Sequence, residues 1–287
     1  MRSAAVKPVV VGIDGSEQAA HTARWAVEEA VGRDVPLRLL YVVRTDLRGP
    51  LSAAEYRTAV DDAKSALHAV RTAIEAGGGP AVVETEIAEG SPAGVLLAES
   101  PDAAMICLGA SGLGRLGRAM LGSTAAAVAE RASCSVAIVR SPGGAGPVAG
   151  QTKWVMVPVS VFTENDDVMG VAVDQARLLQ RPILAVGVWH PDLGATPYEA
   201  LDNMVAEWHD RYPDVHIHPV ATDTGMTQFL HAQPDMAGLV VIDAESAGDV
   251  ASIVGGGHHS QSDEVERAVL VARNYADCRP APTPSMR

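Results

Sequence analysis

The sequence is poor in aromatic side chains, although it is rich in apolar ones. Phe, Trp and Tyr together make up 4% of its 287 residues, whereas hydrophobic residues make up 47%. The core must therefore be built from Ala, Val, Leu and Ile. Long runs of these residues suit strands that are buried on both faces, as in a parallel sheet covered by helices. The length is sufficient for two ordinary domains.

Positive charge is also scarce. The 22 Lys and Arg residues are outnumbered by 35 Asp and Glu residues, and the formal net charge is −13. We expect no nucleic-acid partner, because non-specific binding of DNA or RNA depends on Lys and Arg side chains that neutralise phosphates. A small anionic ligand is still allowed, since backbone N–H groups in a loop or at a helix N-terminus can hold a phosphate without net positive charge.

Signals for export and membrane insertion are missing. The three cysteines, Cys107, Cys134 and Cys278, have no paired spacing, which is typical of a reducing compartment. The N-terminus lacks the apolar segment of a signal peptide. No window approaches the ~18 uninterrupted apolar residues of a membrane helix. We therefore expect a cytoplasmic protein without membrane contacts.

An internal repeat divides the chain. Apolar runs that end at a turn occur at 9–14 and 154–160, and each half closes on an apolar strand that ends in arginine, Arg140 or Arg273. A segment rich in Pro and Gly lies between the halves. The predicted divisions are a first domain at 1–141, a linker at 142–152, a second domain at 153–279 and a proline-rich tail at 280–287.

Strands and helices alternate in the first half. The expected strands are 8–14, 36–43, 81–87, 103–109 and 135–139, and the expected helices are 17–32, 52–77, 91–99 and 123–132. Such alternation predicts a doubly wound parallel sheet. The expected fold class is α/β, with two tandem Rossmann-like or flavodoxin-like domains of strand order 3-2-1-4-5.

The most informative segment is a glycine-rich stretch that follows the fourth strand and leads into the fourth helix. In a doubly wound sheet, ligands bind beyond the carboxyl ends of the strands at the switch point, here between the first and fourth strands. Gly109, Gly112 and Gly122 would let the backbone approach a phosphate without a Cβ in the way. Ser123 and Thr124 offer hydroxyl and N–H groups where the helix dipole favours negative charge.

Asp14, at the end of the first strand, faces the same crevice. A carboxylate there would accept hydrogen bonds from ribose hydroxyls or adenine N–H groups. Two other interpretations stay open. The glycines could form only a connection, although idle connections are usually short, with a median of ~4–6 residues. Asp14 could act only at the start of the helix, where Asp is common.

The glycine pattern resembles that of the ATP-binding universal stress proteins, in which Gly, two residues, Gly and nine residues precede Gly and Ser or Thr. The sequence matches this pattern at Gly109, Gly112, Gly122 and Ser123. The segments 11–16, 40–43 and 89–92 are similar to the family as well, so the resemblance covers the whole first half.

The resemblance implies that ATP binds in the first half, with or without a bound Mg²⁺ ion. In the family, the residue that matches Asp14 and the backbone near Val42 hold the adenosine, and the glycine loop holds the phosphates. The implied site residues are Gly12, Asp14, Val42, Gly109, Ser111, Gly112, Gly122, Ser123 and Thr124.

A regulatory stress-response module with at most slow ATP hydrolysis is the implied function. No nucleophile–base pair is found around residues 109–124, although phosphoryl transfer can proceed by positioning and electrostatics alone. An enzyme that uses ATP and a ligand-free structural dimerisation protein remain the alternatives.

The second half departs from the glycine pattern. Aligning the apolar runs places Asp243 at the position of Gly109, Ser160 at that of Asp14 and Pro158 at that of Gly12. A carboxylate at ~4 Å from a phosphate charge is repelled by about 4 kcal/mol at an effective dielectric of 20. We therefore expect no nucleotide in this half. We also predict no metal site. Four histidines of this half, His216, His218, His258 and His259, invite such an interpretation, but no clear set of three or four ligands includes them.

The two fifth strands, Ser135 to Val139 and Ala268 to Val271, would each leave unpaired backbone groups at a sheet edge. We therefore expect an intrachain pseudo-dimer in which the fifth strands lie side by side. A homodimer of whole chains is a further possibility that the sequence leaves open.

Overall fold

The structure, a computed structural model, describes residues 6–45, 51–78, 82–111, 121–141, 153–160, 165–188, 196–233, 236–254 and 267–273. The first half contains β1 (Val9–Ile13), α1 (Glu17–Gly32), β2 (Leu37–Arg44), α2 (Ala53–Ala76), β3 (Val83–Gly90), α3 (Pro92–Glu99), η1 (Ser100–Asp102), β4 (Met105–Gly109), α4 (Ser123–Arg131) and β5 (Ser135–Arg140). The second half contains β6 (Trp154–Val159), α5 (Asp166–Leu179), β7 (Ile183–Val188), α6 (Thr196–Arg211), β8 (Ile217–Thr222), α7 (Met226–Ala232), β9 (Ala237–Ile242), η3 (Glu245–Asp249), α8 (Val250–Val254) and β10 (Arg267–Val271).

One sheet of ten strands runs through the described residues, in the order β3-β2-β1-β4-β5-β10-β9-β6-β7-β8. Each half has the predicted order 3-2-1-4-5, and the α/β class is confirmed. The first-half elements begin and end within three residues of the sequence predictions, and the largest difference is at the end of β3. The linker at 142–152 and the tail at 280–287 lie outside the described residues, so the domain boundaries stay predictions.

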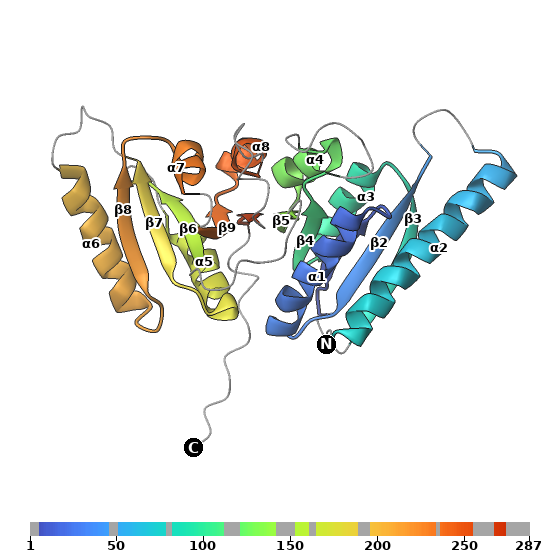
Figure 1. Cartoon of the computed structure of the whole chain (residues 1–287), viewed down its shortest axis with the longest axis horizontal. Coiled ribbons are helices and arrows are strands. Elements are labelled where there is room, and N and C mark those ends of the chain that lie inside the picture. Colours follow the sequence, from blue (N-terminus) through green and yellow to red (C-terminus); the bar gives the residue numbers. More distant parts are fainter. Residues whose placement is uncertain are drawn as a thin grey trace, which may run out of the picture.

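The two halves meet at an antiparallel pair of strands in the middle of the sheet (Figure 1). In this pair, formed by β5 and β10, Arg140 lies opposite Arg267 and Val136 lies opposite Val271. The pairing of fifth strand with fifth strand that the sequence led us to expect is therefore present. It joins two parallel sheets into one, and it satisfies backbone groups that would otherwise lie at two edges.

The remaining edges are β3 and β8. The exposed edge of the first half carries Glu84 and Glu86, and that of the second half carries Pro219 within the strand. Charge and proline both discourage the pairing of an edge with another chain.

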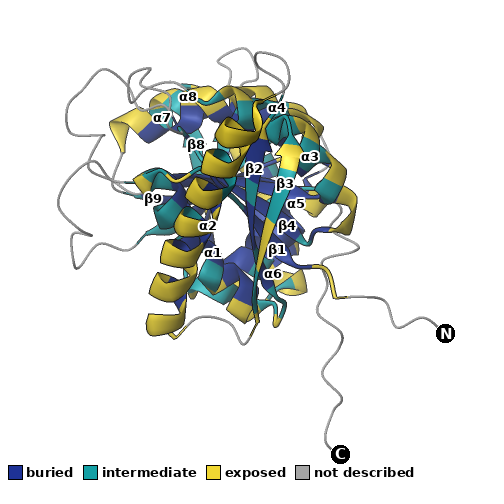
Figure 2. Ribbon diagram, turned by 90° about the vertical axis from the view of Figure 1, so that its right-hand side faces the viewer, coloured by how far each residue is buried: buried dark blue, intermediate teal, exposed yellow. Residues whose placement is uncertain are grey.

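Helices cover both faces of the sheet, and the central strands are buried, whereas the edge strands β3 and β8 are largely intermediate or exposed (Figure 2). One face packs on α1, α2, α5 and α6, and the other on α3, α4, α7 and α8. In β1, Val9 and Val11 point to the first layer and Val10 to the second, as the period of two in a strand requires. Among the described residues, none of the helices has the length and apolar character of a membrane span.

Candidate functional site

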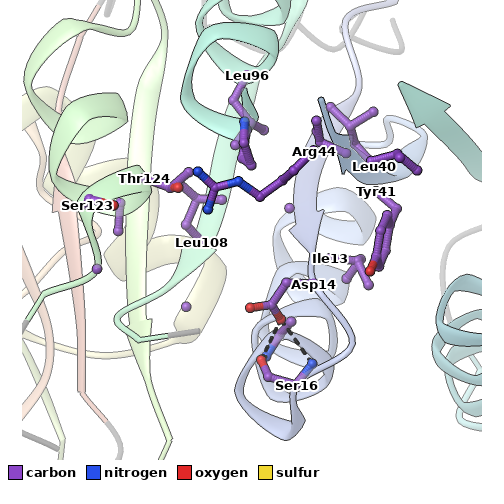
Figure 3. A pocket seen from close by; sticks show the side chains of 18 of the residues that line it. Ile13, Asp14, Ser16, Leu40, Tyr41, Arg44, Leu96, Leu108, Ser123 and Thr124 are labelled. Atoms are coloured by element: carbon purple, nitrogen blue, oxygen red, sulfur yellow. Dashed lines mark hydrogen bonds between the residues drawn. The ribbon is translucent and has the colours of Figure 1, made fainter. Parts of the chain in front are cut away.

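A cavity of about 740 Å³ opens beyond the carboxyl ends of β1, β2 and β4 and reaches the N-terminus of α4 (Figure 3). This is the switch point of the first half, because β1 pairs with β2 on one side and with β4 on the other. The predicted site residues that line the cavity are Gly12, Asp14, Val42, Gly109, Ser111, Gly122, Ser123 and Thr124. The remaining predicted residue, Gly112, lies outside the described residues.

Asp14 both lines the cavity and supports the start of α1. Its Oδ1 accepts hydrogen bonds from the Ser16 backbone N at 3.0 Å and from the Ser16 hydroxyl at 2.6 Å. The Ser16 hydroxyl oxygen in turn accepts from the Ala19 N at 3.1 Å and caps the helix. Gly15, with φ +85°, makes the tight turn between them. The two interpretations of Asp14, as a pocket residue and as a helix-start residue, are therefore compatible.

Strand β2 extends past the end of β1. The last residue of β1, Ile13, lies opposite Tyr41, whereas the register with β3 continues to Arg44. Backbone groups of β2 that point toward β1 therefore face the cavity after Tyr41.

The register shows which groups these are. The Pro36 carbonyl accepts from Val9 of β1, whereas the Leu37 N–H donates to Val82 on the β3 side. Because the N–H and C=O of one residue in a parallel ladder point to the same neighbour, and successive residues alternate, even-numbered residues of β2 face β1. The Val42 carbonyl and the Arg44 N–H therefore point into the space beyond β1, which places a backbone acceptor beside a backbone donor.

The N-terminus of helix α4 differs from those of the other three helices of the first half. In α1, α2 and α3 a serine at the N-cap accepts a hydrogen bond from the first turn of the helix. The N-cap of α4 is Gly122, which has no side chain to do so. Its first-turn N–H groups therefore lack a side-chain cap and lie beside the cavity, where they are suited to a ligand oxygen.

Backbone hydrogen bonds hold the two ends of the glycine loop together. The Ala110 N donates to the Val139 carbonyl at 2.8 Å, and the Gly122 N donates to the Ala110 carbonyl at 2.8 Å. The loop therefore begins and ends at a fixed point beside β5.

The glycines of the site differ in how closely neighbouring atoms approach them. A Cβ on Gly12 would lie 2.5 Å from the Leu108 Cδ2, and a Cβ on Gly109 would lie 2.7 Å from the Gln18 Cγ. A Cβ at Gly12 would displace the end of the Leu108 side chain, and a Cβ at Gly109 would displace the Gln18 side chain. Packing thus favours glycine at both positions, in addition to the role predicted for Gly109 beside a phosphate. A Cβ on Gly122 would meet nothing nearer than the Ala110 carbonyl oxygen at 3.6 Å. Packing does not require glycine at this third position.

Among the described residues, the charged side chains that line the cavity are Asp14, Arg44 and Glu55. Figure 3 shows Arg44 extending from β2 toward the side on which Thr124 lies. Burial, and then the charges of Asp14 and Asp62, raise the pKa of the Tyr41 phenol, which keeps it a neutral hydrogen-bonding group. A hydrogen bond from the Ser52 hydroxyl lowers the pKa of Glu55, whose carboxylate closes the capping box of α2.

The corresponding region of the second half is built differently. The Ser160 N donates to the Asn165 Oδ1 at 3.1 Å, and the Asn165 Nδ2 donates to the Ser160 carbonyl at 2.7 Å, so the Asn165 side chain bridges the end of β6 and the start of α5. After β9, the Asp243 Oδ1 accepts from the Ser246 N at 2.7 Å. The chain then continues as η3 and α8. Helical turns thus occupy the part of the sequence that aligns with the glycine loop.

Sequence reasoning missed Gln18, Tyr41 and Arg44. The position of Arg44 is signalled only by the relative lengths of β1 and β2, and Gln18 carries no motif. Of the histidines considered as metal ligands, His218 makes an edge-to-face ring contact with Trp154, with ring centroids 5.2 Å apart. Within the described ranges, no group of three His, Cys, Asp or Glu side chains is arranged to hold a metal ion.

Comparison with known proteins gives the following likenesses. The family model of the universal stress protein family matches residues 5–140. A universal stress protein of Mycobacterium tuberculosis strain H37Rv is 37% identical over 268 residues, which cover 93% of this chain and 97% of the relative. A second one from this strain is 34% identical over 266 residues, covering 92% and 95%.

Solved structures show the same fold. A universal stress protein from Archaeoglobus fulgidus superposes with a TM-score of 0.68 at 16% identity, over 96% of this chain and 100% of the other. A putative universal stress protein from Pseudomonas aeruginosa gives a TM-score of 0.57 at 17% identity, with 96% of both chains covered.

Proposed function

We propose that this chain, which belongs to the universal stress protein family, binds one ATP molecule in the cavity of its first half. The family has a role in stress responses. Within that role, we propose a regulatory module with at most slow ATP hydrolysis, located in the cytoplasm.

The observation that carries the proposal is the N-terminus of α4. Its first-turn N–H groups lack a side-chain cap at Gly122, and they lie beside a cavity of about 740 Å³. The hydroxyl groups of Ser123 and Thr124 line this cavity as well. A phosphate chain would accept hydrogen bonds from these groups, and the helix dipole would favour its negative charge.

The other end of the cavity suits adenine. The Watson–Crick edge of adenine has an amino donor beside a ring-nitrogen acceptor. The Val42 carbonyl and the Arg44 N–H offer the complementary acceptor and donor. Guanine, with a carbonyl oxygen and a protonated ring nitrogen at these positions, would present the wrong polarity. Unpaired polar groups are costly in a buried site, so this arrangement favours ATP over GTP.

The test uses two aspartate substitutions at N-cap glycines. Gly122→Asp introduces a carboxylate at the predicted phosphate position, and among the described residues the atom nearest to its Cβ would be the Ala110 carbonyl oxygen, at an ordinary contact distance of 3.6 Å. At ~4 Å from one phosphate charge the repulsion is about 4 kcal/mol at an effective dielectric of 20, which corresponds to about a thousandfold loss of affinity.

Gly225→Asp is the matched control, because Gly225 is the N-cap of α7 in the second half and also has open space around it. Asp is a favourable N-cap residue, so both variants should fold. In calorimetric titration, we expect one ATP per chain for the wild type and for Gly225→Asp, and no measurable binding for Gly122→Asp. Wild-type affinity in folded Gly122→Asp would refute the site.

Stoichiometry separates the two halves. The side chains of Asn165 and Asp243 bind backbone groups that follow β6 and β9, so we propose that this half binds no nucleotide. Two ATP molecules per chain would contradict this. If no small molecule co-purifies with the protein and the purified protein binds no adenine nucleotide, the alternative of a structural dimerisation protein is favoured. Association of whole chains into a homodimer stays a prediction.

A further inference from the structure

Gln18 connects three segments of the first half that are distant in sequence. It lies in the first turn of α1, where its Nε2 donates to the Val139 carbonyl at 2.8 Å. Its Oε1 accepts from the Ser141 N at 3.1 Å. One amide therefore ties the start of α1 to the end of β5, where the chain leaves the first half.

The Val139 carbonyl is shared with the glycine loop. It accepts from Gln18 and also from the Ala110 N at 2.8 Å, and the Ala110 carbonyl accepts from the Gly122 N at 2.8 Å. A row of hydrogen bonds thus runs from the Gln18 amide through Val139 and Ala110 to the N-cap of α4.

Packing adds a second connection. A Cβ on Gly109 would lie only 2.7 Å from the Gln18 Cγ, which is too close for two carbon atoms. The side chain of Gln18 therefore lies directly against Gly109, the first residue of the loop, and is linked through the Val139 carbonyl to the next residue, Ala110.

We infer that Gln18 is a positioning residue for the phosphate loop, and this inference rests on the proposed function. Gln18 is not among the residues that line the cavity, so it acts on the nucleotide only through Gly109, Ala110 and Gly122. It keeps the two ends of the loop at the separation at which the N-terminus of α4 faces the cavity.

The same amide reaches the junction between the halves. Val139 lies opposite Ala268 of β10, so Gln18 links the base of the loop to the strand pair that joins the halves. Occupation of the loop by phosphates should therefore rigidify the end of β5.

Gln18→Glu tests the inference. Glutamate has the same length and still accepts from the Ser141 N, but its carboxylate cannot donate to the Val139 carbonyl. We expect the Kd for ATP to rise about tenfold, the equivalent of one hydrogen bond. The Kd for adenosine, which has no phosphates, should stay unchanged. A role in general stability would weaken both ligands equally, so equal losses would overturn the inference, as would wild-type affinity for ATP.

A pH series adds a readout that a purely steric effect would not move. As the pH is lowered through the range in which Glu protonates (~4.3), the acid regains a donor for the Val139 carbonyl. The ratio of the Kd of the variant to that of the wild type should then fall toward one; a constant ratio would contradict the hydrogen-bond role. Asn165→Asp is the control, because it makes the same change in an amide that binds the backbone of Ser160 in the second half, and it should not alter ATP affinity.

Hydrogen exchange in the absence of nucleotide separates this inference from the proposed function. The amides of Ala110 and Gly122 should exchange faster in Gln18→Glu than in the wild type, whereas amides in the middle of β4 should not. If the wild type binds no ATP but this difference is found, the proposed function fails and the positioning of the loop stands. If the two amides exchange at the wild-type rate, the inference about Gln18 fails.

Discussion

A buried polar pair across the junction of the halves allows a quantitative prediction. Glu29 of α1 and Gln175 of α5 are 1% and 0% exposed, and the Gln175 Nε2 donates to the Glu29 Oε2 at 2.9 Å. Arg33 donates to the same carboxylate oxygen through two nitrogens, each at 3.1 Å. Within the described residues, the Glu29 Oε1 and the Gln175 Oε1 are buried without a hydrogen-bond partner. The prediction concerns a double-mutant cycle that compares the stability of the wild type with that of Glu29→Leu, Gln175→Leu and the double variant.

The expected magnitudes follow from which groups remain buried. Glu29→Leu leaves the whole Gln175 amide buried and unpaired, and an unsatisfied buried group costs about 1–3 kcal/mol. Gln175→Leu removes a hydrogen bond to a charged group, worth about 1.5–3 kcal/mol. In the double variant neither polar group remains, and the half-buried Arg33 can reach water. We expect a loss of about 2 kcal/mol for each single variant and about 1 kcal/mol for the double, a coupling of roughly 3 kcal/mol.

Urea unfolding of the whole chain, followed by circular dichroism, measures these changes, provided that the slope of the free energy with urea is the same in all four proteins. The exposed i,i+4 pair Arg71–Glu75 on α2, with side chains 47% and 52% exposed, is the control cycle and should give a coupling below about 0.5 kcal/mol. Additive losses at Glu29 and Gln175, summing to about 4 kcal/mol in the double variant, would refute the reasoning.

Two further predictions concern packing and pH. Gly12→Ala should destabilise the first half by about 1–3 kcal/mol, because the new Cβ would meet the Leu108 side chain; Leu108→Ala in the same chain should make the glycine substitution nearly neutral, and calorimetric unfolding would show whether it does. A hydrogen bond from Arg211 lowers the pKa of Asp166, and one from Arg177 lowers the pKa of Asp214. These two ion pairs therefore contribute fully to stability at pH values above the ordinary pKa of Asp, and the contribution is lost as the pH falls through the lowered folded-state pKa. The fluorescence of Trp208, whose indole donates to Asp166, should change in this acid range, and Asp166→Asn should abolish that change.

The sequence was sufficient for the architecture because the signals for it are local. Each strand is a short apolar run and each helix has its own cap or stop, and the alternation of the two allows few topologies. Ser16 and Ser91 were recognisable as caps from their positions, and both accept the expected hydrogen bonds.

The site was only partly predictable, because some of its determinants are distances between segments. Gly109 matches a known spacing, but the contact that favours glycine there comes from Gln18, on another element. The pair of backbone groups at Val42 and Arg44 depends on where β1 ends relative to β2. In the second half, the alignment with the glycine loop correctly marked Asp243 as a departure, but it did not show that the following residues form helical turns.

The second half also contributes to the proposed site from outside the cavity. Arg273, which follows β10, donates to the carbonyls of Ala129 at 2.6 Å and Glu130 at 3.0 Å in the last turn of α4. Burial lowers the pKa of this guanidinium from its usual value, but the group stays protonated at neutral pH. A cation at the C-terminus of a helix stabilises the helix and complements its dipole. The dipole of α4 points its positive end at the cavity, so the helix that would bind the phosphates is held at its other end by the second half. Removing that half would expose β5 and release the C-terminus of α4 together, which gives a physical reason for retaining a copy that has lost the glycine pattern.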